Sequence, residues 1–394
     1  MPRFVSVSLA VFASTALVAC SETPVTEPNA IQTNATPIFT VSDNAQVLAG
    51  RFIITVRDGV SPRAVAADHG VTPDFVYTHA LNGFAGSMAD AARDGLLRDA
   101  RVSRVEPDGI AEAWTSQSPA TWGLDRIDQG ALPLNNTYTY TNTGSGVTAY
   151  IIDTGIQISH TDFGGRASVG YDAIGDGRNG LDCNGHGTHV SGTTGGSTYG
   201  VAKSVTLVAV RVLNCSGSGT WSGVIAGLDY VTGDTRRPAV GNMSLGGGAS
   251  TSVDDAVKRT IASGVAMAVA AGNGNQGGRA QDACKYSPAR VPEAMTIGAT
   301  DKTDTKTSWS NYGNCVDWFA PGLGITSDWL NGGTNTISGT SMATPHTTGV
   351  AALYLQGNSS ATPQQVRDAL YAATTKGVVN SSKTVNNHLL FTNY

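Results

Sequence analysis

The hydrophobic and polar positions after residue 114 alternate between short apolar runs and longer stretches of helical pattern. Four apolar runs of strand length are rich in Val, Ile and Ala, and they span residues 147–153, 205–212, 240–244 and 265–271. Five stretches of helical pattern lie between or after them, at residues 186–194, 221–232, 252–263, 341–356 and 362–373. Apolar strands separated by helices are typical of a parallel sheet that is buried on both faces. We therefore expect an α/β unit with a central, mainly parallel sheet and with functional residues at the carboxyl ends of its strands.

A smaller block of alternating elements precedes this region. Residues 51–56, 80–86 and 102–106 are predicted strands, and residues 61–69 and 89–99 are predicted helices. The first helix opens with Ser61 and Pro62, a capping residue followed by the residue best suited to a first helical position. The resulting β-α-β-α-β order predicts a small α+β unit, a pattern that many unrelated modules share.

The first twenty residues have the features of an export signal. Arg3 supplies a positive charge, and residues 5–19 are mostly apolar but too short and interrupted to span a membrane. The segment ends in Leu-Val-Ala-Cys at residues 17–20, which resembles the lipobox of bacterial lipoproteins and makes Cys20 the expected lipidated residue. An ordinary signal peptide with a coincidental cysteine is the alternative. Residues 21–48 are rich in Thr, Pro, Asn and Ala, which predicts a disordered tether.

Composition narrows the possible partners and the redox state. The chain has 394 residues, 40% of them hydrophobic, which is enough for one large domain or two. Its formal net charge of -5, without a basic block, argues against nucleic acid as a partner. Four of the five cysteines lie after residue 114, where they allow three disulfide pairings. Disulfides persist in exported proteins, and the lack of C-x-x-C spacing argues against a metal-thiolate site.

Three glycine-flanked motifs carry the groups that acyl transfer needs. Asp153 lies in Ile-Ile-Asp-Thr-Gly, His186 in Asn-Gly-His-Gly-Thr-His, and Ser341 in Gly-Thr-Ser-Met-Ala-Thr-Pro-His. A serine hydroxyl is a weak acid, so it needs an imidazole to accept its proton and a carboxylate to orient that imidazole. The Asp-His-Ser order separates this chain from the chymotrypsin and α/β-hydrolase orders.

Other interpretations of the same motifs are less consistent with the sequence. An aspartic protease needs two carboxylates that share a proton, and the chain has no second Asp-Thr-Gly. A zincin needs a Glu between its two histidines, and none lies between His186 and His189. If the three motifs were only glycine-rich turns without a function, their order and spacing would be unexplained. His189, His160 and His346 are expected to be structural.

These motifs resemble those of the subtilases, and most closely those of the proteinase K branch, with cysteine positions similar to aqualysin-like bacterial members. The resemblance runs from about residue 117 to the C-terminus, with a separate match for the region before it. It implies a subtilisin-like three-layer fold for residues 115–394 and a propeptide, acting as inhibitor and chaperone, for residues 49–114. It also implies the disulfides Cys183–Cys215 and Cys284–Cys315.

The subtilase pattern implies further residues around the nucleophile. Its oxyanion-binding amide corresponds to Asn273 in Val-Ala-Ala-Gly-Asn, although an Asn after Gly is by itself usually a turn residue. The helix that begins at Ser341 should add free N–H groups and the positive end of its dipole. Two small-residue segments should pair with an extended substrate, and three small residues should line an apolar pocket for the residue before the scissile bond. These expected substrate-binding residues are Gly217, Ser218, Gly219, Ser244, Leu245, Gly246, Gly247, Ala270, Ala271 and Gly272. For Trp221, a distant subsite and the core are equally expected.

Calcium is the expected metal, because both implied sites offer hard oxygen ligands. The first resembles the proteinase K site, with the Asp317 carboxylate and the carbonyl oxygens of Pro292 and Ala294. The second resembles a site of aqualysin-like enzymes. Its implied residues are Asp125, Asp128 and Gln129, with Asn135 and Thr137 as additional candidates. Solvated turn acids are the alternative at both places.

The sequence thus predicts an exported, monomeric serine endopeptidase of broad specificity that removes its own inhibitory propeptide. Large apolar or aromatic residues are expected before the scissile bond, because no charged residue is expected in the pocket. Through Cys20 the precursor is expected to be lipid-anchored to a bacterial membrane, and the mature enzyme to be extracellular or periplasmic. An inactive subtilase fold that serves as a binding module and an esterase are the alternatives. Intact triad residues argue against the first, and two segments suited to an extended peptide argue against the second.

Overall fold

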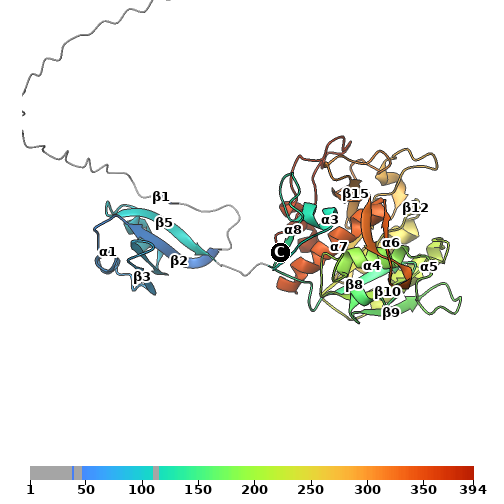
Figure 1. Cartoon of the computed structure of the whole chain (residues 1–394), viewed down its shortest axis with the longest axis horizontal. Coiled ribbons are helices and arrows are strands. Elements are labelled where there is room, and N and C mark those ends of the chain that lie inside the picture. The colour runs from blue at the N-terminus through green and yellow to red at the C-terminus, as the bar shows by residue number, and fades with distance from the viewer. Residues whose placement is uncertain (1–37, 40–46, 110–114) are drawn as a thin grey trace, which may run out of the picture. The chain divides into compact units, whose positions relative to one another are not determined.

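The computed structural model describes residues 38–39, 47–109 and 115–394. The chain divides into two compact units between Ala111 and Glu112, and each unit is described by itself (Figure 1). The predicted export signal, its lipobox cysteine Cys20 and most of the predicted tether lie outside the described residues. Within the described ranges, no helix combines the length and the apolar character needed to cross a bilayer.

The first unit is a small α+β fold with a sheet in the order β1-β5-β2-β4-β3. Its elements are β1 (Ile38–Phe39), β2 (Val47–Val56), α1 (Pro62–Asp68), β3 (Phe75–Tyr77), β4 (Gly83–Ser87), α2 (Asp90–Leu96) and β5 (Val102–Gly109). The Ser61 hydroxyl caps α1 by accepting the Ala64 N–H, as a capping residue should. Because β1 and the start of β2 fall within residues 21–48, part of the predicted tether is paired in this sheet instead.

The second unit is built on a parallel sheet of seven strands in the order β16-β15-β13-β11-β8-β10-β9. The strands are β8 (Thr148–Asp153), β9 (Ala167–Asp172), β10 (Thr206–Arg211), β11 (Ala239–Met243), β13 (Val265–Ala270), β15 (Met295–Thr300) and β16 (Trp318–Pro321). The helices are α3 (Trp122–Ile127), α4 (His186–Gly195), α5 (Trp221–Gly233), α6 (Thr251–Ala262), α7 (Thr340–Gly357) and α8 (Pro363–Ala373). Three antiparallel pairs complete it, namely β6 (Thr115–Gln117) with β7 (Tyr138–Tyr140), β12 (Gly247–Gly248) with β14 (Tyr286–Ser287), and β17 (Ile325–Asp328) with β18 (Thr334–Ile337). The predicted parallel α/β sheet is therefore confirmed, with three strands beyond the four predicted.

Helices cover both faces of this sheet and make three layers. Successive side chains of a strand point to opposite faces. Ala149 and Ile151 of β8 accordingly lie in one core with residues of α4 and α7, which is orange in Figure 1. Tyr150 and Ile152 lie in the opposite core, with residues of α5 and α6. The three-layer arrangement that the resemblance implies is thus present in the second unit.

The order of the strands places three functional segments side by side at the carboxyl ends of the sheet. Strand β11 lies between β8 and β13, and all three run in the same direction. Asp153 ends β8, Ala270 ends β13, and Ser244 directly follows β11. The carboxyl ends of parallel strands are the usual place for an active site in an α/β sheet.

Candidate active site

Asp153 and His186 form a hydrogen-bonded pair at the carboxyl end of β8. His186 Nδ1 lies 2.8 Å from Asp153 Oδ1, and the Asp153 side chain is fully buried while that of His186 is 25% exposed. Burial lowers the pKa of His186, but the charge and hydrogen bond of Asp153, with a further contribution from Asp182, raise it above its ordinary value. With Nδ1 held by the carboxylate, Nε2 is the nitrogen left to exchange a proton with a substrate or nucleophile.

Asp182 joins the segments that carry these two residues, and the sequence analysis missed it. Its Oδ1 accepts the Thr154 hydroxyl at 2.9 Å and two backbone N–H groups of the turn before α4 at 2.9 and 3.0 Å. Its Oδ2 accepts the backbone N–H and hydroxyl of Thr188 at 2.9 and 2.6 Å. One buried carboxylate therefore ties the residue after Asp153 to the turn and helix around His186. An Asp just before a helix is a local capping signal, but its bond to Thr154 arises only in the folded chain.

Ser341 lies in the first turn of α7, where Pro345 alters the helical hydrogen bonding. Proline has no N–H, so the Ser341 carbonyl lacks its usual partner four residues later. The Ser244 hydroxyl donates to that carbonyl at 2.8 Å, and the Ser341 hydroxyl donates to the Ser244 carbonyl at 3.1 Å. These two bonds hold the expected nucleophile against the end of β11. Among the described residues no hydrogen bond joins Ser341 to His186, but Ser244 and His186 line the same pocket.

Asn273 follows β13, and Thr340 determines how its amide points. The amide oxygen accepts both the backbone N–H and the hydroxyl of Thr340 at 2.8 Å. The amide nitrogen is therefore the end left free to donate in the pocket that Asn273 shares with Ser341. Gly272 allows this turn because its φ is 99°, and a Cβ there would lie 2.5 Å from Asn311 Nδ2.

Asn311 is a second positioning residue that the sequence analysis missed. Its Nδ2 donates to the Ala271 carbonyl at 2.8 Å, and its Oδ1 accepts the N–H groups of Gly274 and Gln281 at 3.0 and 2.8 Å. These bonds close the loop that carries Asn273. Because the partners are 30 to 40 residues away, no local pattern identifies Asn311.

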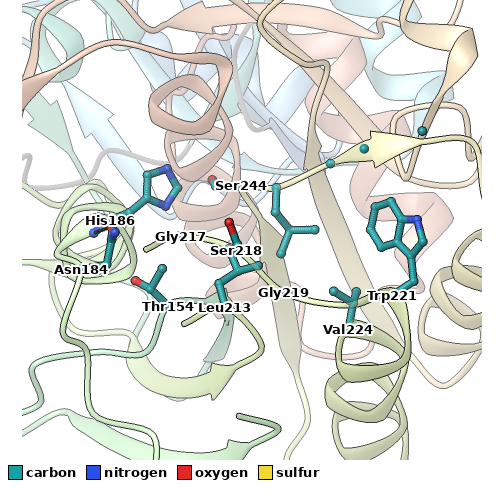
Figure 2. Close-up of a pocket in the computed structure, with 14 residues that line it drawn as sticks. Thr154, Asn184, His186, Leu213, Gly217, Ser218, Gly219, Trp221, Val224 and Ser244 are labelled. Atoms are coloured by element: carbon teal, nitrogen blue, oxygen red, sulfur yellow. Dashed lines mark hydrogen bonds between the residues drawn. The ribbon is translucent and has the colours of Figure 1, made fainter. Parts of the chain in front are cut away.

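Two adjoining pockets surround these residues. The larger, of about 510 Å³, contains His186 and Ser244 and extends to Trp221, and Figure 2 shows His186 and Trp221 at its opposite ends. The smaller, of about 270 Å³, contains Asn273 and Ser341. They share the segment 245–247, and each of the ten predicted substrate-binding residues lines at least one of them.

One part of the expected substrate segment is already paired. Gly247 and Gly248 form β12, in which Gly247 pairs with Ser287 of β14. A substrate can therefore use only the other edge of this segment. Trp221 packs against it, since a Cβ on Gly247 would lie 2.8 Å from the indole. The indole thus lines the pocket and also packs against the core beneath it, so the structure is consistent with both expectations for Trp221.

Both disulfides implied by the resemblance are present. Cys183 bonds to Cys215, and Cys284 bonds to Cys315. The first joins the turn before α4 to the segment just before residues 217–219, which line the larger pocket. In the described part of the chain, Asp176 with Cys183 and Cys215 is the one group of three His, Cys, Asp or Glu side chains close enough to share a metal. Its sulfurs are joined to each other, so they are not thiolate ligands.

The first implied calcium site does not fit a metal ion, because an arginine already bridges its oxygens. Arg367 Nη2 donates to Asp317 Oδ1 at 2.5 Å, and Nη1 donates to the Pro292 carbonyl at 2.6 Å. Ala294 closes the same turn through its N–H, which bonds to the Val291 carbonyl at 3.2 Å. The expectation of calcium at Asp317 is therefore not supported by the arrangement of its oxygens.

The second implied site is better suited to a cation. Asp128 Oδ2 accepts the Thr139 N–H at 2.6 Å, whereas its buried Oδ1 has no hydrogen-bond partner within the described ranges. Burial, with the charge of the neighbouring Asp125, raises the pKa of Asp128 to about 6. A buried, unpaired carboxylate oxygen beside a second carboxylate is suited to a hard cation. The Gln129 carbonyl already accepts Arg126 Nη1 at 2.6 Å, so its side-chain oxygen is the more available ligand.

Comparison with known proteins identifies the family of this chain. The Subtilase family matches residues 144–389. An extracellular serine proteinase of Thermus sp. (strain Rt41A) is 58% identical over 326 residues, which cover 82% of this chain and 78% of that protein. The alkaline serine exoprotease A of Vibrio alginolyticus is 50% identical over 329 residues, which cover 82% of this chain and 61% of that protein. A solved structure of a cold adapted subtilisin-like serine proteinase is similar with a TM-score of 0.67 and 55% identity, and the match covers 70% of this chain and 98% of that one. The chain therefore belongs to the subtilase family of serine endopeptidases.

Proposed function

We propose that the chain is a secreted serine endopeptidase whose catalytic triad is Asp153, His186 and Ser341. The observation that carries this proposal is the 2.8 Å bond between His186 and the buried Asp153, in a cleft that also contains Ser341. His186 takes the proton of the Ser341 hydroxyl as it attacks a peptide carbonyl, and Asp153 stabilises the imidazolium that forms. For this step the hydroxyl must leave the Ser244 carbonyl, a rearrangement expected when substrate tightens the site. The extracellular proteinase of Thermus supports secretion.

Asn273 is the proposed oxyanion donor. Its amide nitrogen and the free N–H groups at the start of α7 would face the oxygen that becomes negative in the transition state. The two hydrogen bonds from Thr340 to the amide oxygen hold this donor in place before substrate arrives. A donor that is already oriented stabilises the transition state without reorganisation at the moment of reaction.

The smaller pocket supports a preference for large apolar or aromatic residues before the scissile bond. Its volume is about 270 Å³, and no charged residue lines it. The segments 217–219 and 244–246 line the larger pocket and offer backbone groups to an extended peptide. Main-chain pairing is independent of the substrate side chains, so we expect broad specificity.

The first unit is the proposed propeptide, which inhibits the enzyme until self-cleavage near Trp114. An aromatic residue at that position would suit the uncharged pocket. The predicted lipid anchor at Cys20 would stay with the propeptide, so that cleavage would release a soluble enzyme.

Calcium is proposed at Asp125 and Asp128, where it would neutralise two neighbouring carboxylates. The unpaired Asp128 Oδ1 supports this site. Neither residue lines the cleft around Ser341. Calcium bound there would therefore contribute to stability and not to the bond-breaking step.

Hydrolysis of an unstructured protein by the purified chain is the direct test. Cleavage should stop on treatment with a serine-reactive sulfonyl or phosphonyl reagent and in Ser341→Ala, while Ser252→Ala, at an exposed position of α6, should retain it. Cleavage of small esters without cleavage of protein would favour the esterase. Binding of protein without any hydrolysis would favour the inactive binding module.

A further inference from the structure

Asp317 is a buried carboxylate whose two oxygens have different kinds of partner. Its exposed fraction is 8%, and its Oδ2 accepts the backbone N–H of Thr296 at 2.8 Å. Its Oδ1 contacts the guanidinium of Arg367, whose other terminal nitrogen reaches the Pro292 carbonyl. Arg367 lies 50 residues from Asp317 and 75 residues from Pro292 in the chain. Folding therefore brings a carboxylate oxygen and a carbonyl oxygen from separate segments to one positive group.

Helix α8 holds this arginine firmly. The helix begins with a capping box, in which Thr362 and Gln365 satisfy each other's backbone N–H groups. Val366 and Leu370, on either side of Arg367, are buried and anchor the helix to the rest of the unit. The Arg367 side chain is only 26% exposed. Its guanidinium is thus presented to Asp317 by a packed helix and not by a surface loop.

The guanidinium supplies what a cation would supply at this place. A buried carboxylate is strongly unfavourable without a positive partner. Arg367 offers that charge together with two N–H groups, one for the Asp317 carboxylate and one for the Pro292 carbonyl. Calcium needs six to eight oxygen ligands around it, so it cannot bind while the guanidinium lies between Asp317 and Pro292.

We propose that Arg367 takes the place of a metal ion at the Asp317 site, so that a cation built into the chain holds these oxygens together. This part of the enzyme should keep its stability when calcium is removed. Any dependence of stability on calcium must then come from another site.

Arg367→Ala tests the proposal by removing the guanidinium while leaving both oxygens in place, and alanine preserves the helix. The mature enzyme, blocked with a sulfonyl reagent to prevent self-digestion, should melt at a lower temperature than wild type without calcium. Millimolar Ca²⁺ should restore the melting temperature, and equilibrium dialysis should find one more bound ion than in wild type. Terbium, which can replace calcium, should show luminescence excited through Trp318, the residue next to Asp317.

Two controls separate this site from others. Asp317→Asn combined with Arg367→Ala should lose the additional ion, while Arg259→Ala, at an exposed position of α6, should gain none. Arg367→Lys keeps a positive charge and should remain folded without calcium, which gives a second variant if Arg367→Ala is too unstable to purify. The proposal is overturned if Arg367→Ala gains no ion. It is also overturned if Asp317→Asn alone removes a bound ion from the otherwise wild-type enzyme. The melting temperature and the number of bound ions are both measured on the blocked enzyme, so neither readout depends on proteolytic activity.

Discussion

The carboxyl groups of Asp162 and Asp328 should limit the stability of the enzyme at alkaline pH. Asp328 is fully buried at the end of β17, and neither of its oxygens has a hydrogen-bond partner in the described part of the chain. Burial, with the charge and proximity of Asp162, raises the pKa of Asp328 to about 8, against a smaller opposing effect of Arg166. His160 Nδ1, 3.6 Å from Asp328, accepts the backbone N–H of Asp162, so it has no proton to donate. Asp328 is therefore protonated at neutral pH and can donate its own proton to Asp162.

The size of the effect follows from the pKa difference between the folded and unfolded states. An unfolded aspartate has a pKa of about 3.9, so the folded protein binds more protons than the unfolded chain between about pH 4 and pH 8. Its free energy of unfolding must then fall as pH rises through that range. About four pKa units at about 1.4 kcal/mol each give about 6 kcal/mol, an upper bound because water can enter the opened site.

Asp328→Asn should remove this loss of stability. Asparagine has the shape of a protonated aspartate, can donate to Asp162 and cannot ionise. Variant and wild type should be similar at about pH 5, and by about pH 9 the variant should melt up to about 10 °C higher. The measurement is thermal unfolding of the inhibitor-blocked mature enzyme at a fixed scan rate, with exposed Asp255→Asn as control. Parallel pH dependence of the melting temperature in wild type and Asp328→Asn would refute the reasoning.

Four further predictions concern the site and the maturation of the enzyme. Asn273→Ala should lower kcat by about 10²–10³ with little change in KM, the size known for the corresponding donor in subtilisin. If only KM changed, Asn273 would contribute to binding of the substrate and not to stabilisation of the transition state. The value of kcat/KM should rise with pH through the pKa of His186, because only neutral imidazole accepts a proton. Burial lowers this pKa, but Asp153 and Asp182 raise it above its ordinary value. A profile that is flat between about pH 5 and 8 would contradict its role as base. Chelation of calcium should lower the melting temperature more than the initial rate, and Asp128→Asn should abolish this dependence; an unchanged melting temperature would argue against the site. Ser341→Ala should leave the propeptide attached and, because Cys20 precedes the cut, keep the protein in the membrane fraction. If this precursor were as soluble as the active enzyme, the predicted lipid anchor at Cys20 would be wrong.

Hydrophobic periodicity predicts the elements nearest the site to within a few residues. It places strands at 147–153 and 265–271, and β8 and β13 span Thr148–Asp153 and Val265–Ala270. It does not predict β15 or β16. The first contains Gly and the second ends in Pro, and both residues weaken the strand pattern. Their strand conformation depends on parallel pairing with β13 and with each other, which a local pattern does not contain.

The same limit applies more strongly to charged groups. Four buried aspartates of the second unit each have a different kind of partner. Asp153 has an imidazole, Asp182 has backbone N–H and hydroxyl groups, Asp317 has a guanidinium, and Asp328 has another carboxyl group. The motifs give the partner correctly only for Asp153, because the partners of the others are set largely by tertiary contacts. At Asp317 the motif locates the oxygens correctly but not the positive charge that neutralises them, because that charge comes from a helix 50 residues away. A metal site transferred by resemblance therefore has to be checked against every cationic side chain that the fold brings to its oxygens.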